Sequence, residues 1–309
     1  MIVLEGLKER VKFDRPVVTI GNFDGLHIGH QRIIEEVKEK AREIGGVSVL
    51  VTFDPHPLTL LDPKKIRGLI TPLPLKKRIL REAGIEVLII LNFDENLREL
   101  EPEEFVKSLL VEGIGVFGLV LGWDFRFGKG AKGDVDLLQK LSKKYGFFFK
   151  KIDPVTLDGE KVGSNRIRKM IEEGDVKRAK DFLGRPFLVT GKVIYGAGMG
   201  RKIGFPTANI ATYENQLLPK NGVYITEIEF QGRYLPSVTN IGFKPTFGYK
   251  KISVETHILG FYEDLYGMEL DVIFHQRLRD EKAFNSLDKL KEAIRDDVAK
   301  AEEFFSVRS

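Results

Sequence analysis

The hydrophobic and polar positions along the chain fall into two patterns, one in each half. In the first half, short apolar runs alternate with stretches in which apolar residues recur every three or four positions, which is the period of a helix. The apolar runs predict strands at residues 17–20, 47–53, 87–91, 117–121 and 147–152. Strands that alternate with helices predict a parallel, doubly wound sheet with helices on both faces. Such a sheet binds ligands in the crevice beyond the carboxyl ends of its strands.

Helices are predicted between and after these strands. Apolar residues recur at helical spacing over residues 33–44, and the pattern stops at Gly45. A second helix is predicted to begin with Thr71 as its N-cap and Pro72 at the first helical position, and to end before Gly84. Two more helices are predicted at residues 164–173 and 175–183.

The pattern changes after residue 183, where strand-like runs follow one another without helices between them. Turn residues such as Asn221 and Gly222 separate the runs, which predicts an antiparallel sheet or a small barrel. The runs are residues 187–194, 223–230, 234–238, 253–258 and 270–274. A last helix, with Ser286 as its N-cap, closes the chain. We therefore predict two domains, residues 1–183 and residues 184–309.

Composition adds limits on size and partners. A chain of 309 residues exceeds the usual size of a single hydrophobic core, which favours two domains. The net charge of +4 is spread along the chain and forms no basic stripe of the kind that binds nucleic acid. The apolar runs are too short to span a bilayer, and the charges in the first ten residues do not fit a secretory signal. We expect a cytoplasmic protein that binds small molecules and neither nucleic acid nor membrane.

Cysteine is absent from the sequence, which narrows the possible chemistry. A disulfide, a thiolate zinc site, an iron–sulfur cluster and a cysteine nucleophile are all excluded. Three of the five histidines, His27, His30 and His56, fall within the first sixty residues, close to predicted strand ends. This placement indicates a shared site at one edge of the predicted sheet.

The segment from Gly21 to His30 follows the first predicted strand and opens the first predicted helix. Its glycines permit a tight turn and close approach of a phosphate, and a helix N-terminus favours an anion. His27 and His30 project to one side of a helical turn, where they could share the charge that builds on a phosphoryl group. A pair of surface histidines and a two-histidine metal site are the alternatives. The other candidate phosphate-binding residues of the segment are Asn22, Phe23, Asp24, Gly25 and Gly29.

Two further loops are predicted to face the same crevice. His56 follows the second strand, and residues 122–130 follow the fourth. The second loop looks like a phosphate-binding P-loop, but its glycines are one residue too far apart and Gly130 replaces the required hydroxyl residue. A P-loop is therefore excluded. Trp123 and Asp124 could still contact a nucleotide or an aromatic ring, and an ordinary strand-to-helix loop is the alternative.

Residues 21–30, 52–57 and 122–128 resemble the nucleotidyltransferase half of prokaryotic bifunctional FAD synthetases, the riboflavin kinase/FMN adenylyltransferase family. The His-Ile-Gly-His sequence also occurs in class I aminoacyl-tRNA synthetases. The chain has no Lys-Met-Ser-Lys-Ser segment and no room for a tRNA-binding extension, so a synthetase is disfavoured. The resemblance implies that His27 and His30 stabilise the α-phosphate of ATP while pyrophosphate leaves. We expect His56 and Asp124 to line the flavin or nucleotide crevice, because their loops are predicted to face it.

The chain departs from this family at the start of a late helix that binds the phosphates of ATP. Members usually have Ser-Ser-Thr/Ser-x-Ile-Arg there, and Ser164, Ile167 and Arg168 match this pattern. Gly163 and Asn165 do not match. Asparagine is a good N-cap whose amide can reach an oxygen, and an arginine fork suits phosphate. We expect the departure to affect rate or nucleotide affinity rather than fold, and a plain surface charge is the alternative for Arg168.

The second informative segment spans residues 191–209. Gly196, Gly198 and Gly200 could form a loop that folds over phosphates, and a flexible hairpin is the alternative. Thr207 and Asn209 are two positions apart on a predicted extended segment, so their side chains point the same way. Oxygen donors of this kind suit Mg²⁺.

The second half of the chain contains several segments in the order found in riboflavin kinases. They are residues 204–209, 223–224, 240–242, 244–246, 254–258, 264–267 and 278–284. This resemblance implies that Thr207 and Asn209 hold the magnesium bound to ATP, and that Glu255 accepts the proton of the ribityl 5′-hydroxyl. It also implies that residues 196–202 form a flap over the nucleotide and that Arg279 faces the flavin. Further ATP-binding residues implied by it are Arg201, Lys202 and Gly204.

Together the two resemblances imply a bifunctional enzyme. It would convert riboflavin and ATP to FMN and ADP, and then FMN and a second ATP to FAD and pyrophosphate, both with Mg²⁺. The FMN phosphate is already anionic, so the second step needs no general base. An enzyme that keeps only the kinase, and a non-catalytic flavin-binding regulator, are the alternatives. The presence of Thr207, Asn209 and Glu255 together argues against a regulator, because a protein that only binds flavin needs no base.

Overall fold

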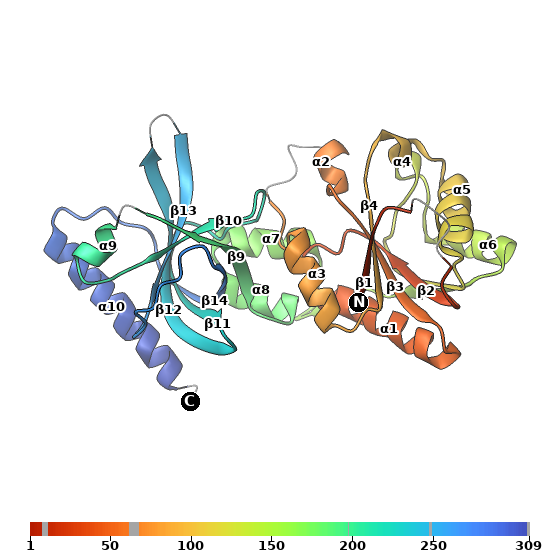
Figure 1. Cartoon of the computed structure of the whole chain (residues 1–309). Helices are drawn as coiled ribbons and strands as arrows, with labels where there is room; N and C mark the ends of the chain where they lie inside the picture. Colours follow the sequence, from red (N-terminus) through yellow and green to blue (C-terminus); the bar gives the residue numbers. More distant parts are fainter. Residues whose placement is uncertain (8–11, 62–67, 197, 247–248, 308–309) are drawn as a thin grey trace. The chain divides into compact units, whose positions relative to one another are not determined.

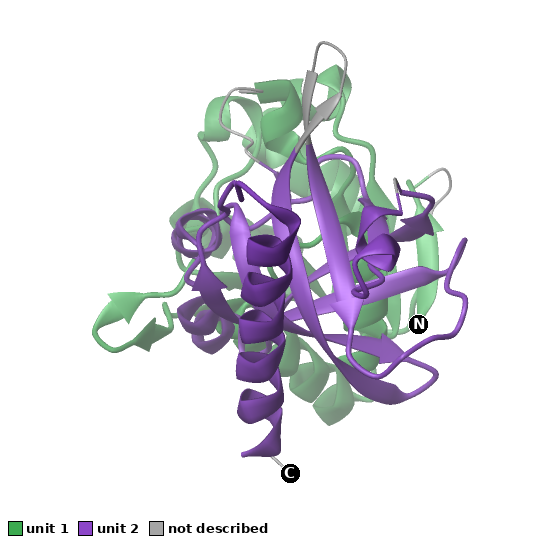
Figure 2. Cartoon of the chain, turned by 90° about the vertical axis from the view of Figure 1, so that its left-hand side faces the viewer, with its two compact units in different colours: residues 1–67, 71–163 green, residues 68–70, 164–309 purple. Residues whose placement is uncertain are grey.

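The computed structural model describes residues 1–7, 12–61, 68–196, 198–246 and 249–307. The chain forms two compact units (Figures 1 and 2). Unit 1 comprises Met1–Arg67 and Thr71–Gly163, and unit 2 comprises Gly68–Ile70 and Ser164–Ser309. Each unit has its own sheet and its own buried core.

Unit 1 is built on a six-stranded parallel sheet of order β1-β4-β3-β2-β5-β6. Its strands are β1 (Ile2–Glu5), β2 (Pro16–Ile20), β3 (Val47–Phe53), β4 (Val87–Leu91), β5 (Gly118–Gly122) and β6 (Phe148–Ile152). The five predicted strands are confirmed, within one residue at each end. The edge strand β1 was not predicted, because it is only four residues long and half exposed.

Helices cover both faces of this sheet, as the alternating pattern predicted. The π-helical segment η1 and helix α6 pack on one face, and α1 and α3 pack on the other. Strands β2 and β4 are buried along their whole length between these layers, which explains why all their residues except Thr19 are apolar. The other elements of unit 1 are α1 (Ile28–Ile44), α2 (Pro57–Leu61), α3 (Leu73–Glu82), α4 (Glu95–Glu99), α5 (Pro102–Glu104), η1 (Phe105–Ile114), η2 (Lys129–Ala131), α6 (Val135–Tyr145), β7 (Thr156–Leu157) and β8 (Glu160–Lys161).

The strand order places a topological switch point between β2 and β5. The chain runs from β2 through β3 to β4 in one direction across the sheet, and then returns to β5 on the other side of β2. The loops that follow β2 and β5 therefore diverge at the carboxyl edge of the sheet, where open α/β sheets bind ligands. The fold thus puts the Gly21–His30 segment and the loop of Trp123 at this edge.

Unit 2 is a closed antiparallel barrel of order β10-β13-β12-β11-β14-β9, followed by the helix α10 (Figure 1). Ser286 caps this helix, and its hydroxyl accepts the N–H of Lys289 as predicted. The strands β12, β13 and β14 are longer than predicted because their polar ends continue the ladder with neighbouring strands. The elements are α7 (Ser164–Glu173), α8 (Val176–Leu183), β9 (Phe187–Ile194), α9 (Met199–Lys202), β10 (Ala208–Thr212), β11 (Gly222–Phe230), β12 (Arg233–Thr246), β13 (Tyr249–Ile258), β14 (Glu269–Arg279) and α10 (Leu287–Ser306).

One predicted helix start is wrong. The N-cap of α3 is Pro72 rather than Thr71, and the helix begins at Leu73. Thr71 is buried, and its backbone N–H donates to Asp24 Oδ1 at 2.9 Å. The Thr71 side chain does not cap the helix, because its Oγ1 is buried and makes no hydrogen bond within the part of the chain that the structure describes.

The compact units do not divide at the predicted domain boundary between residues 183 and 184. Helices α7 and α8 belong to unit 2, which begins at Ser164. The apolar face of α8 packs against β14 and β9, and Ile171 of α7 accepts the N–H of Lys220 through its carbonyl oxygen. The packing of these two helices therefore follows the barrel, and the division of the two activities at residue 183 stays a prediction.

Candidate functional site

The loop between β2 and α1 has an unusual backbone conformation. Phe23, Gly25 and Leu26 have φ values of 47°, 89° and 44°. Glycine adopts such angles freely, but Phe23 and Leu26 are strained there, and neighbouring groups must hold them. The sequence predicted a turn at this place and did not predict its left-handed form.

Two side chains and one backbone N–H from other parts of unit 1 hold this loop. The Asn22 carbonyl oxygen accepts hydrogen bonds from Lys76 Nζ at 2.6 Å and from Thr52 Oγ1 at 3.3 Å. Asp24 Oδ1 accepts the Thr71 N–H at 2.9 Å. The carboxylate of Asp24, which was predicted to contact phosphate, is thus buried and bonded to the backbone. Sequence reasoning missed Lys76, whose charge gives no local indication that it is buried.

His27 and His30 come together at the start of α1. His27 is the N-cap, and its Nδ1 accepts the His30 N–H at 3.3 Å. The two rings are stacked, with centroids 3.6 Å apart and planes 15° apart. A neutral His27 that accepts at Nδ1 carries its proton on Nε2, which makes Nε2 the donor atom of this ring. The predicted projection of both rings to one side agrees with this geometry.

Two other predicted phosphate-binding residues support the histidine rings. The Phe23 ring lies 5.0 Å from the His30 ring, centroid to centroid. A Cβ on Gly29 would lie 3.2 Å from the His27 ring, so glycine leaves room for that ring. These contacts indicate that the segment positions the imidazoles as much as it forms a phosphate cradle.

The other two loops of the crevice end at the same edge of the sheet. His56 is buried and its Nδ1 accepts the Leu58 N–H at 3.2 Å, so its ring closes the first turn of α2. Asp124 is exposed beside Gly122 at the end of β5. Trp123 is 38% exposed, and Lys161 Nζ lies 3.8 Å from its ring centroid. Trp123 therefore offers a partly open aromatic face beside the switch point.

The residues predicted to bind the phosphates of ATP at the late helix lie in unit 2. Ser164 is the first residue of α7. Arg168 donates through Nη1 to Asn165 Oδ1 at 3.0 Å and through Nε to the Gly68 carbonyl at 3.2 Å. A Cβ on Gly163 would meet nothing within 4 Å. Arg168 is thus a held side chain, and its role beside the histidines of unit 1 stays a prediction.

A row of three polar residues crosses the barrel in unit 2. Glu255 on β13 pairs in register with Asn209 on β10 and with Asn240 on β12. Residues directly opposite each other on antiparallel strands share a face of the sheet. Val254 and Thr256 are buried while Glu255 is half-buried, which confirms the predicted alternation along this strand.

The glycines of the predicted flap lie directly against the predicted metal-binding side chains. A Cβ on Gly196 would lie 2.2 Å from Asn209 Nδ2. A Cβ on Gly200 would lie 2.3 Å from the Phe205 carbonyl oxygen and 3.2 Å from Thr207 Oγ1. Only glycine permits this close approach, so the structure brings the flap and the Thr207–Asn209 segment together. The remaining predicted ATP-binding residues also lie here: Gly198 precedes α9 with a φ of 68°, Arg201 and Lys202 are exposed on α9, and Gly204 follows it with a φ of 91°.

Arg279, predicted to face the flavin, is bonded to the helix α10. Its Nε lies 3.1 Å from both carboxylate oxygens of Asp297, and its Nη2 lies 2.7 Å from Oδ2. Asp297 is 2% exposed. The guanidinium therefore anchors the segment after β14, and a contact with flavin stays a prediction.

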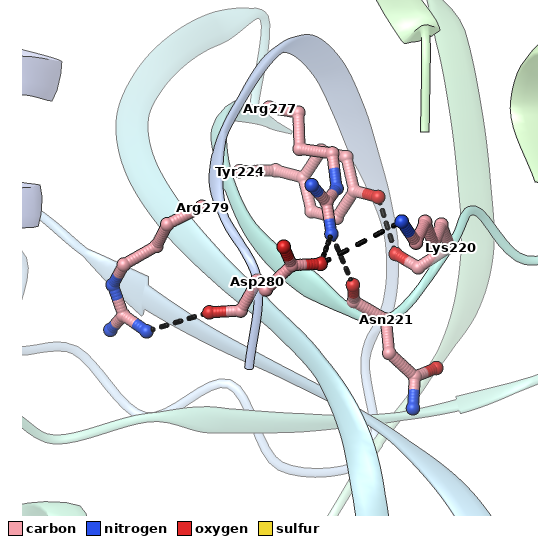
Figure 3. Close-up of polar contacts among 6 residues, drawn as sticks. All are labelled: Lys220, Asn221, Tyr224, Arg277, Arg279 and Asp280. Atoms are coloured by element: carbon pink, nitrogen blue, oxygen red, sulfur yellow. Dashed lines mark hydrogen bonds and ion pairs between the residues drawn. The ribbon is translucent and has the colours of Figure 1, made fainter. Parts of the chain in front are cut away.

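Figure 3 shows a second anchor of the same segment. Arg277 Nη2 donates to the Asn221 carbonyl at 2.6 Å and to Asp280 Oδ1 at 2.7 Å, and Lys220 Nζ lies 3.7 Å from the same carboxylate oxygen. The hydrogen bond from Arg277 holds the pKa of Asp280 below its ordinary value. The Asp280 carbonyl accepts from Arg279 Nη1 at 3.1 Å. Asp280 is thus fixed through both its side chain and its backbone.

The anchored segment carries Glu281 to the polar row of the barrel. A Cβ on Gly242 would lie 2.1 Å from Glu281 Oε1 and 3.0 Å from Asn240 Nδ2. Gly242 therefore leaves the space that Glu281 occupies beside Asn240. The sequence contained this segment as a motif, and only the fold places it next to the row of Glu255.

Comparisons with known proteins agree with the family resemblance of each half of the chain. The family model described as FAD synthetase matches residues 10–166, and the model described as riboflavin kinase matches residues 183–305. A bifunctional riboflavin kinase/FMN adenylyltransferase of Pseudomonas fluorescens is 40% identical over 292 residues, which cover 92% of this chain and 91% of that protein. The Escherichia coli K12 protein of the same description is 37% identical and covers 94% of this chain and 93% of its own length.

A solved structure shares the whole fold. It is described as a macrolide-efflux protein from Streptococcus pneumoniae, superposes with a TM-score of 0.88 at 28% identity, and covers 98% of this chain and 99% of that one. In the part of the chain that the structure describes, every helix is too short or too polar to cross a membrane.

Proposed function

The chain belongs to the bifunctional riboflavin kinase/FMN adenylyltransferase family, and from this premise we propose which residues carry its two reactions. The enzyme phosphorylates riboflavin with ATP to give FMN, and it adenylylates FMN with a second ATP to give FAD and pyrophosphate. Two observations carry the residue assignment. His27 and His30 stack at the start of α1 in unit 1. In unit 2, Asn209, Asn240 and Glu255, which lie on three different strands, meet in one cross-strand row.

In the kinase reaction, Glu255 accepts the proton of the ribityl 5′-hydroxyl as that oxygen attacks the γ-phosphorus of ATP. The bond between the γ-phosphorus and the bridging oxygen breaks, and ADP leaves. The register of β13 with β10 supports this role, because it puts the carboxylate next to Asn209, at the segment that the flap covers. The flap glycines close over the transferred phosphate and exclude water.

Thr207 and Asn209 would hold Mg²⁺ that enters with ATP. Their side chains offer oxygen donors side by side under the flap, which is the donor chemistry that Mg²⁺ prefers. No group of three His, Cys, Asp or Glu residues suited to a metal occurs within the described ranges, so phosphate oxygens would complete the coordination. When bound, the cation neutralises charge on the phosphates.

In the adenylyl transfer, an oxygen of the FMN phosphate attacks the α-phosphorus of ATP and the bond to pyrophosphate breaks. His27 and His30 stabilise the charge on the α-phosphate through their ring N–H groups at the N-terminus of α1. Ser164, Asn165 and Arg168, at the start of α7 in unit 2, stay our predicted ligands of ATP phosphates. Trp123 and Asp124 lie beside the switch point, where the nucleotide or the flavin ring would bind.

Both reactions draw on ATP, and we place the enzyme in the cytoplasm, with riboflavin, FMN, FAD and ATP as its small-molecule partners and no nucleic-acid partner. Cell fractionation followed by both activity assays tests the location. Recovery of the activities with the membrane fraction would contradict it.

A chromatographic product assay tests the residue roles. The protein receives riboflavin, ATP and Mg²⁺ in one series, and FMN, ATP and Mg²⁺ in another. His30→Ala should stop the first series at FMN, and Glu255→Ala should leave riboflavin unchanged while FMN is still converted to FAD. FAD formation by His30→Ala at the wild-type rate would refute the histidine role, and FMN formation by Glu255→Ala at that rate would refute the base.

A further inference from the structure

A buried lysine connects three segments of unit 1 beneath the histidine loop. Lys76 lies near the start of α3 and is 5% exposed. Its Nζ donates to the Asn22 carbonyl at 2.6 Å and to Thr52 Oγ1 at 3.3 Å, and the Thr52 hydroxyl itself lies 3.3 Å from that carbonyl. One ammonium group thus joins α3, the end of β3 and the first residues of the loop after β2.

Packing alone does not explain a charged side chain at this buried position. Burying an ammonium group costs free energy unless bonds and opposite charges offset the loss of water. Burial lowers the pKa of Lys76 below its ordinary value, and the carboxylates of Asp24 and Asp54 act in the opposite direction. An apolar side chain would continue the buried positions Leu75 and Leu80 of the same helix without this cost. We therefore attribute the lysine at this position to the two hydrogen bonds that its ammonium group donates.

The hydrogen bonds to the Asn22 carbonyl hold the loop next to its strained residues. Asn22 immediately precedes Phe23, the first of the residues with positive φ. Strained backbone of this kind persists only where the surroundings determine it. The other end of the loop is His27, whose capping bond to His30 sets the position of both rings. A shift at Asn22 would pass along this short loop to the imidazoles.

We propose that Lys76 is a positioning residue of the adenylyltransferase site, whose ammonium group holds the loop between β2 and α1 in the conformation that presents His27 and His30 to ATP. The proposal rests on the role assigned above to the two histidines. The hydrogen bonds of the Lys76 ammonium group go to Asn22 and Thr52 and not to the histidines. Its effect is on the geometry of the histidines, and a displacement of about 1 Å at such groups can cost about 100-fold in rate.

The test compares two neighbouring lysines of one helix. Lys76→Met removes the ammonium group, and Lys77→Met is the matched control, because Lys77 is partly exposed and lies 3.5 Å from the Glu5 carboxylate at the surface. Lys76→Met should lower kcat for FMN to FAD about 100-fold with a much smaller change in the KM for FMN. The kinase activity, whose residues lie in unit 2, serves as the internal reference and should not change. Lys77→Met should keep both activities.

Amine rescue separates positioning from folding. Lys76→Ala should regain part of its adenylyltransferase activity in the presence of methylammonium or ethylammonium, and Lys77→Ala should not respond. Wild-type FAD formation by Lys76→Met would overturn the proposal, as would a parallel loss of both activities or an absence of rescue. His30→Ala, assayed beside them, distinguishes a failure of the proposed histidine role from a failure of the proposed Lys76 role. An active His30→Ala refutes the histidine role, whereas an inactive His30→Ala with an active Lys76→Met refutes the lysine role alone.

Discussion

The two sites are held in place by different physical means. In unit 1, the histidines lie at the end of a strained loop. Side chains from α3 and β3 and the backbone N–H of Thr71 hold this loop. In unit 2, Asn209, Glu255 and Asn240 occupy one cross-strand row, so the hydrogen-bond ladder of the barrel sets their positions. The first arrangement depends on a few side-chain bonds. The second depends on backbone register and on glycines that permit close approach.

This difference determines which substitutions should matter. A site set by strand register tolerates the loss of a surface side chain but not an added atom where two segments touch. A site set by side-chain anchors tolerates added atoms at open positions but not the loss of an anchor. The substitutions below test these statements in order of decreasing effect.

The largest effect is expected at the contact between the flap and Asn209. Gly196→Ala adds a Cβ 2.2 Å from Asn209 Nδ2, so the flap or the amide must move. We expect the kinase rate to fall about 100-fold and its Mg²⁺ dependence to shift, because the displaced amide is a proposed metal ligand. FMN to FAD should be unaffected. A variant with the wild-type kinase rate would show that the flap does not need this contact.

A smaller effect is expected where the barrel site does use an anchor. Asp297→Asn weakens the charge-assisted bonds of Arg279 to α10, and breaking a buried pair of this kind typically costs about 3 kcal/mol of stability. The segment of Glu281 should loosen, which raises the KM for riboflavin about tenfold, on the order of 1.4 kcal/mol. Denaturant titration and kinase kinetics measure the two effects. Its exposed neighbour gives the control Asp296→Asn, and equal behaviour of the two variants would contradict the anchor.

At an open position of the transferase half, an added side chain should be harmless. Gly163→Ser restores the residue usual in the family, and a Cβ there meets nothing within 4 Å. We expect an increase of a few-fold in FMN adenylylation, because one more hydroxyl becomes available to the ATP phosphates, and no change in the kinase. A fall in adenylylation would show that Gly163 is required as glycine.

The smallest effect is expected in how the free energy of unfolding depends on pH through the buried Lys76. Burial lowers the pKa of Lys76 in the folded chain, so between that value and the ordinary value near 10.5 the unfolded chain binds more protons. The contribution of Lys76 to the free energy of unfolding therefore rises with pH across this window and is constant below it. Denaturant titrations at increasing alkaline pH should give wild type a more positive slope than Lys76→Met, while Lys77→Met follows wild type. Equal slopes for all three would mean that the folded pKa is not lowered.

Local pattern was sufficient for much of the fold. The central strands of the parallel sheet are mostly apolar because helices cover both faces, so their sequences reveal them directly. The strands of the barrel carry polar ends, and their full lengths appear only through pairing with neighbours. Thr71 shows the opposite failure. It is a residue typical of helix caps, but its backbone is bonded to Asp24 and Pro72 occupies the cap position.

The candidate sites were predictable in part for the same reason. His27 and His30 lie within one helical turn, so their common direction follows from spacing. Lys76 gave no such indication, because its burial and its bond to Asn22 arise only when α3 packs against β3 and β4. Helices α7 and α8 likewise join the barrel through contacts with strands far along the sequence.

The sequence by itself determined the alternation of central strands and helices in the first half and the succession of strands in the second. It also determined the segments that carry chemistry and the two activities that their motifs resemble. It could do so because periodicity, glycine placement and residue spacing act over a few residues. Only the tertiary structure decided that Glu255 stands between Asn209 and Asn240, that Glu281 reaches Gly242, and that Lys76 holds the histidine loop. Each of these depends on register or burial between distant segments, which no local pattern encodes.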